Sequence, residues 1–101
     1  MNQFKTKVTV ISVTKTNGKY SCQCFPFGDK SISVLLYEET ENTAELFKIV
    51  RQFMNAIYLT MLNEGVQMIF EISCDKEIEQ RVEMYFKGSL DIYGEVFFVS
   101  I

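Results

Sequence analysis

The stretch FKTKVTVISVTKTNGKYSCQCF, residues 4–25, consists of two apolar runs on either side of Asn17-Gly18. A two-residue type I′ turn needs a positive φ at both of its central residues, and Asn-Gly satisfies this requirement best. The stretch therefore predicts a β-hairpin. In the first strand a period of two puts four residues on one face: Phe4, Thr6, Val8 and Val10. Because Ile11 and Val13 are apolar as well, we expect a bulge or bend at which this strand changes the face that it buries.

A third strand is expected directly after the hairpin. Pro26 cannot donate to a central hydrogen-bond ladder and Gly28-Asp29 favours a turn, so the second strand ends here. The segment SISVLLY, residues 31–37, then alternates with a period of two. Its inward residues are expected to be Ile32, Val34 and Leu36. Residues 4–38 are thus predicted to form a three-stranded meander.

The segment from residue 38 to residue 65 predicts a long helix. Asn42 followed three residues later by Glu45 resembles a capping box, and Gly65 supplies a C-terminal stop. The apolar residues between them spread over roughly 220° of the helix circumference. A helix that packs on one sheet needs about half of that width. We therefore expect either the end of a barrel or a second subunit to cover the remainder.

The C-terminal third contains two predicted strands and, between them, a segment that fits two different structures. The segment VQMIFEIS, residues 66–73, reads as a fourth strand with Val66, Met68, Phe70 and Ile72 or their neighbours inward. Residues 74–89 fit two structures, a short helix or a loop that leads into a strand around RVEMYF. The segment LDIYGEVFFVSI, residues 90–101, predicts a closing strand with a bend at Gly94.

The composition is that of one globular domain, residues 1–101. Apolar residues make up 48% of the chain and charged residues 23%, which excludes an intrinsically disordered segment. No apolar run reaches the roughly 18 residues that a membrane span needs, and the N-terminal residues lack the features of a signal peptide. Three cysteines, an odd number, fit a reducing compartment. We expect a cytoplasmic protein without membrane contact, in the host cytoplasm if the protein is viral.

Charge is distributed unevenly along the chain. Residues 1–30 contain five lysines and one aspartate, a net charge of +4, whereas residues 31–101 carry a net charge of −7. A basic end on an acidic chain favours a surface that binds polyanions. The alternative is that lysines only protect short strand edges against aggregation. Charge alone does not separate these two interpretations.

Several kinds of chemistry are not supported by the residues. The chain has no histidine, which removes most acid–base, triad and metal-ligand arrangements. Cys22 and Cys24 fall on the same face of a strand, and Cys74 is the only other thiol, so we expect buried core cysteines and no metal. No glycine-rich phosphate loop is present. We therefore expect a protein that is not an enzyme and has no cofactor.

The order of elements is three meander strands, one helix and a closing pair of strands, which is the layout of an OB-fold, a five-stranded barrel. The helix lies between strands three and four. The alternative fold is an α+β open sheet crossed by one helix. In overall plan residues 4–100 resemble the phage-encoded OB-fold single-stranded DNA-binding proteins of the lactococcal-phage type. The resemblance implies a dimer, tetramer or other homo-oligomer that coats single-stranded DNA during phage replication or recombination, with replication or recombination proteins as further partners.

Binding of single strands without sequence preference needs cations for the phosphates and exposed rings for base stacking. In an OB-fold strands two and three form much of this surface. If Tyr20, Cys22 and Cys24 face the core, the residues between them face outward. The candidate nucleic-acid-binding residues are Lys5, Lys7, Lys15, Lys19, Gln23, Phe25, Phe27, Lys30, Tyr37, Arg81, Tyr85 and Lys87.

Two further functions fit the same sequence. One is a small acidic interaction or inhibitor protein that binds a host protein through residues 31–101, whose charge would imitate phosphates. The other is a minor structural subunit whose exposed helix face packs into a larger assembly. The first of these is the stronger alternative to single-stranded DNA binding.

Overall fold

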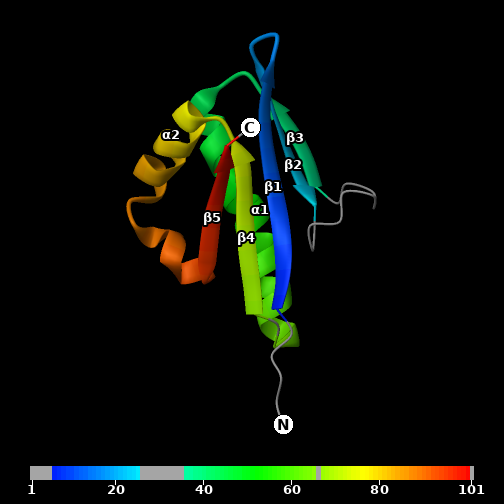
Figure 1. Ribbon diagram of the computed structural model, residues 1–101. Coiled ribbons are helices and arrows are strands. Elements are labelled where there is room, and N and C mark those ends of the chain that lie inside the picture. Colours follow the sequence, from blue (N-terminus) through cyan, green and yellow to red (C-terminus); the bar gives the residue numbers. More distant parts are fainter. Residues whose placement is uncertain (1–5, 26–35, 66, 101) are drawn as a thin grey trace.

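The computed structural model describes residues 6–25, 36–65 and 67–100. Within these ranges a five-stranded sheet carries helices on one of its faces (Figure 1). In chain order the elements are β1 (Thr6–Thr16), β2 (Lys19–Phe25), β3 (Leu36–Thr40), α1 (Thr43–Glu64), β4 (Gln67–Cys74), α2 (Lys76–Phe86), a 3₁₀ helix η2 (Ser89–Tyr93) and β5 (Glu95–Ser100). The strand order across the sheet is β3-β2-β1-β4-β5.

The predicted hairpin is confirmed. Asn17 and Gly18 both have positive φ, 54° and 79°, and join β1 to β2, which pair antiparallel from Thr16↔Lys19 to Val10↔Phe25. On its other side β1 pairs with β4 in the parallel sense. β1 is therefore the central strand of the sheet.

The bulge or bend expected in β1 is absent from the described strand. β1 pairs residue for residue with both neighbours, so one alternation holds along its whole length. Thr9, Ile11 and Val13 face the helices, and the hydroxyl of Thr9 donates to the Met68 sulfur at 3.1 Å. Val10 is only 4% exposed yet lies outside the main core cluster, because it points to the opposite face. Val10 therefore shares a face with Val8, as the period of two predicted, and that face is the one opposite the helices. A central strand can bury side chains on both faces, because the side chains of the two adjacent strands surround its own on each face.

The long helix begins and ends as predicted. The Asn42 side chain accepts hydrogen bonds from the backbone N–H of Ala44 at 2.9 Å and of Glu45 at 3.3 Å, and Gly65 ends the helix with φ of 69°. The Asn42 N–H is satisfied by the Thr40 hydroxyl at 3.1 Å. The large apolar residues of α1 are buried or half-buried except for Leu59 and Leu62, each 59% exposed.

Of the two structures that fitted residues 74–89, the helix is the one observed. The Asp75 carboxylate accepts from the Ile78 N–H at 2.8 Å and starts α2, which buries Ile78, Val82 and Phe86 on a single face. The closing strand is shorter than predicted, because residues 89–93 form η2 and β5 starts only at Glu95. The bend at Gly94 is confirmed by its φ of 91°.

Both helices cover the same face of the sheet. The core cluster unites Ile11 of β1, Cys22 of β2 and Phe70 of β4 with residues of both helices. In Figure 1, α1 runs behind β4 and β1, while α2 lies beside β5. Parallel neighbours need a long crossover connection, and the two parallel pairs, β1–β4 and β4–β5, each receive a helix in that crossover.

The described strands form an open sheet with edges β3 and β5, and they do not close into the expected OB-fold barrel. The apolar surface of the long helix was expected to be covered in part by the end of a barrel or by a second subunit. In the described residues α1 lies across one face of an open sheet. The alternative prediction of an open sheet crossed by a helix matches this arrangement, although two α-helices are present where one was predicted.

Candidate functional site

The sheet has a second face, opposite the helices, which we call the open face. Strand alternation and the pairing registers define its residues. They are Val8, Val10, Ser12, Thr14 and Thr16 of β1; Lys19, Ser21, Gln23 and Phe25 of β2; Tyr37 and Glu39 of β3; Gln67, Ile69, Glu71 and Ser73 of β4; and Glu95, Phe97 and Val99 of β5. Both described α-helices pack on the other side, so this face is the candidate functional surface.

The predicted orientation of β2 is confirmed. Cys22 and Cys24 are fully buried in the core cluster together with Tyr20, whereas Gln23 and Phe25 point to the open face and are half-buried. Leu36 pairs with Cys24 and packs against the core, as expected. The positions predicted for Ile32 and Val34 lie outside the described residues.

Two aromatic rings lie close together on the open face. Tyr37 of β3 pairs with Gln23 of β2, and Phe25 is two residues from Gln23 on the same face. The two rings are thus diagonal neighbours, with Cα atoms roughly 7–8 Å apart for such a pair. Tyr37 is 48% exposed, and its hydroxyl donates to the Glu39 carboxylate, which raises the pKa of Tyr37.

The candidate lysines do not all share this face. Lys19 does, and it is exposed at the start of β2. Lys15 lies on the helix-covered side, with its Nζ 5.3 Å from the centre of the Tyr20 ring, and Lys7 alternates to that side as well. The other three candidates of the N-terminal part lie outside the described residues: Lys5, Phe27 and Lys30.

The candidates of α2 lie on the helix layer and do not extend the open face. Arg81 forms an ion pair with Glu77 at 3.2 Å. The Tyr85 ring stacks on Phe47 at a centroid distance of 5.4 Å. Lys87 occupies the left-handed position that ends α2, with φ of 50°. Arg81 and Tyr85 thus make their contacts within the helix layer, and Lys87 has a role in ending the helix.

Three carboxylates and one exposed ring of the open face were not among the candidates. Glu39, Glu71 and Glu95 place three carboxylates on it, and Phe97 is 53% exposed on β5. Alternation within EVFFVS would have indicated Phe97, because Val96 and Phe98 then take the covered side. The three carboxylates can be assigned to one face only when the pairing between strands distant in sequence is known.

The three thiols belong to the covered side. Burial raises the pKa of Cys22 to about 12, with the neighbouring Cys24 and Glu38 adding to the effect. Burial likewise raises the pKa values of Cys24 and Cys74 to about 11. All three remain protonated at neutral pH, whereas metal ligation and nucleophilic attack need the thiolate. Across residues 6–25, 36–65 and 67–100 no cluster of three or more carboxylate or thiol side chains is arranged to hold a metal ion.

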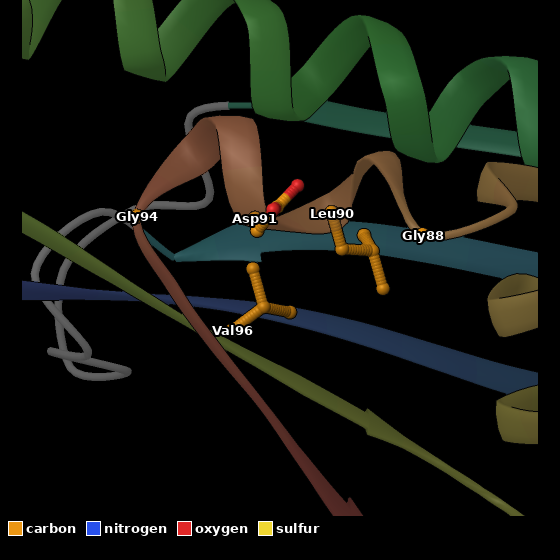
Figure 2. Close-up of a pocket in the computed structure, with 5 residues that line it drawn as sticks. All are labelled: Gly88, Leu90, Asp91, Gly94 and Val96. Carbon is orange, nitrogen blue, oxygen red and sulfur yellow. The ribbon is translucent and has the colours of Figure 1, made fainter.

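A hollow of about 360 Å³ lies between η2 and β5 (Figure 2). It is lined by Gly88, Leu90, Asp91, Gly94 and Val96. The Leu90 and Val96 side chains point into the same space, while the Asp91 carboxylate points toward α1. One ionisable group and two apolar side chains suit an apolar guest better than an acid–base reaction.

Comparison with models of protein families, with curated proteins and with solved structures returned no match to this chain. In the part of the chain that the structure describes, neither α-helix has the length and apolar character to cross a membrane. The geometry of the open face is therefore the basis for a functional proposal.

Proposed function

We propose that this protein binds single-stranded DNA without sequence preference and without catalytic activity, on the β2–β3 part of the open face. The observation that carries the proposal is the diagonal pair of Phe25 and Tyr37, with Gln23 between them. Bases of any sequence stack on aromatic rings, and each stacked base contributes about 1–3 kcal/mol. The spacing of the two rings suits successive bases of an extended strand.

The surroundings of the two rings supply polar contacts. The Gln23 amide can donate to and accept from base edges, and Lys19 can contact a phosphate. Glu39 and Glu71 lie on the same face and oppose the approach of phosphates. We therefore expect stacking to contribute more to the affinity than charge does. The affinity should fall with salt concentration only as steeply as a few phosphate contacts require.

An open sheet is sufficient for this mode of binding. Sheets that present rings on one face stack two or three bases without closing into a barrel. Closure into an OB-fold is thus not required for the proposed function. In a phage-infected cell the proposed role is to coat single strands in the host cytoplasm during replication or recombination.

The test is a titration with oligo(dT) at low and at moderate salt. The chain has no tryptophan and five tyrosines, so quenching of tyrosine emission can follow binding.

We expect Phe25→Ala to weaken binding by about 1–3 kcal/mol, with a smaller loss for Lys19→Gln. Because Tyr37→Ala removes part of the signal, its affinity is measured by fluorescence anisotropy of labelled oligo(dT). Leu59→Ala on the outer face of α1 is the control and should bind like the parent protein. Absence of binding at low salt would refute the proposal.

A second function is favoured by one specific observation, the coincidence of carboxylates and apolar side chains on the open face. Glu71 lies between Val10 and Phe97 in the same row across the sheet. Such a surface fits an acidic interaction protein that binds a basic, partly apolar partner. A stoichiometric complex with one host protein that survives nuclease treatment and is lost in Glu71→Lys would favour this function. A parent protein that captures no host protein, together with tighter binding of oligo(dT) by Glu71→Lys, would favour DNA binding.

A further inference from the structure

We infer that a second copy of this chain pairs with β5 across the free edge of the sheet, so that two five-stranded sheets join in an antiparallel manner. This inference does not depend on DNA binding. It rests on the difference between the two edge strands, on a self-complementary register of β5 and on the hollow beside that strand.

The two edges of the sheet differ in their protection. β3 carries consecutive exposed carboxylates, Glu38 and Glu39, and charged side chains are a common means of blocking an edge. β5 has a single charge, Glu95, at its first residue, followed by VFFV. In the described residues β5 has a hydrogen-bonding neighbour on one side only, β4, so its other row of backbone N–H and C=O groups has no strand partner.

The side chains of β5 are incompletely covered on both faces. On the open face Phe97 is 53% exposed and Val99 is 41% exposed. On the helix-covered face Val96 and Phe98 are only half-buried, in contrast to the fully buried Phe70 on the neighbouring strand. An additional strand would remove apolar surface from water on both sides of the sheet at once.

A two-fold axis at Phe97 gives β5 a register with itself that opposes no like charges. Phe97 then lies opposite Phe97 of the second copy, Val96 lies opposite Phe98, and Glu95 lies opposite Val99. The same operation on β3 would place Glu38 opposite Glu38, and like charges directly opposite are destabilising. A register centred on the middle of the strand thus opposes like charges in β3 and none in β5, so charge favours β5 as the edge that pairs with its own copy.

The hollow between η2 and β5 lies beside this register (Figure 2). Val96, which lines it, would have Phe98 of the second copy as its directly opposite neighbour on the helix-covered face. Directly opposite side chains have Cβ atoms about 4.5–5.5 Å apart, so the incoming ring lies next to Val96 and Leu90. Strand addition in which the backbone supplies affinity and a pocket receives a side chain is an established mode of recognition.

The first test is the mass in solution, measured by sedimentation velocity over a concentration series. We expect the parent chain to reach twice its monomer mass of 11.7 kDa. Phe97→Lys puts two ammonium groups opposite each other and should give the monomer, whereas the matched change Tyr37→Lys on β3 should leave the dimer. A monomer at every concentration, or a dimer that persists in Phe97→Lys and is lost in Leu59→Lys on α1, would overturn the inference.

The second test addresses the register. Val99→Lys brings an ammonium group opposite Glu95 of the second copy, and Val99→Glu brings a carboxylate there, with the same loss of apolar side chain. We expect the dimer dissociation constants of these two variants to differ by at least fivefold in favour of lysine. Equal dissociation constants would rule out this register.

The third test is a cross-link. The native thiols are buried with raised pKa values, so a cysteine on the open face should be the reactive one. Mild oxidation of Phe97→Cys should yield a covalent dimer on a non-reducing gel, and oxidation of Tyr37→Cys should not. Equal cross-linking of both variants would show random collision and contradict pairing through β5.

Discussion

The two faces of the sheet are built from alternate residues of the same strands, yet they differ in almost every property. On the covered face Cys22, Cys24 and Phe70 are completely buried, whereas on the open face Tyr37 and Phe97 are about half exposed. A solvent-exposed sheet face is usually polar. Here rings and branched side chains alternate with serines and glutamates, a composition more typical of a binding surface than of a merely solvated one. The covered face thus accounts for stability, and the open face is the site of the proposed functions.

The contrast between the faces is tested most directly by removing one phenylalanine from each. Phe70→Ala empties a fully buried site and should lower the free energy of unfolding by about 3–5 kcal/mol. Phe97→Ala, at a site that is 53% exposed, should cost less than about 1 kcal/mol at a protein concentration at which only the monomer is present. Urea denaturation followed by circular dichroism measures both. Similar losses in the two variants would show that the open face also contributes to the core.

The covered face should also make the protein sensitive to alkaline pH. The pKa of Cys22 is raised by burial from 9.0 to about 12, so the folded state keeps a proton that the unfolded state releases above pH 9. Stability is therefore unaffected by this thiol below pH 9 and falls as the pH rises from 9 toward 12, by at most about 1.4 kcal/mol per pH unit. Urea denaturation across this range checks the slope. In Cys22→Ala the decline should be shallower, and an unchanged slope would exclude this thiol as the cause.

Val10 is the most buried apolar residue of the open face, with an exposure close to that of a core residue. Val10→Ala removes two buried methyl groups and should cost about 1–2 kcal/mol in the free energy of unfolding. Val99→Ala, on the same face but 41% exposed, is the matched control and should cost much less in the monomer. The measurement is again urea denaturation, at a protein concentration at which only the monomer is present. Equal costs would mean that exposure does not distinguish the centre of this face from its edge.

The smallest expected effect concerns charge on the open face. Glu71→Gln removes a carboxylate that opposes phosphates and should tighten binding of oligo(dT) by less than about 1 kcal/mol. The gain should shrink as salt is added. Glu83→Gln on α2 is a control that should leave the affinity unchanged. An equal gain in both variants would assign the effect to net charge and not to the open face.

Local signals predicted the local structure well. Asn17-Gly18 identified the hairpin, Asn42 and Gly65 identified the ends of α1, and alternation identified the buried cysteines of β2. Each of these signals acts within a few residues, so it can be read from sequence alone. The orientation of Phe25 and Tyr37 could be predicted for the same reason.

Arrangement between distant segments could not be predicted in the same way. The parallel pairing of β1 with β4 brings Val10 next to Glu71, and nothing in either segment specifies that contact. A bend was expected in β1 because its apolar residues do not keep to one alternating face, whereas burial on both faces of the strand explains this run without a bend. The candidates Arg81 and Tyr85 were grouped with the sheet because residues 74–89 were compatible with either a helix or a strand.

The central position of β1 also has a consequence for folding. One edge of β1 can pair early, because β2 follows after a two-residue turn. The other edge can pair only after β4 has been synthesised, and β4 begins at Gln67, after α1. Contacts at such sequence separation form slowly, and unpaired edges promote aggregation in the meantime. During synthesis the half-paired β1 would therefore be the most vulnerable part of the nascent chain until residues 67–74 have left the ribosome.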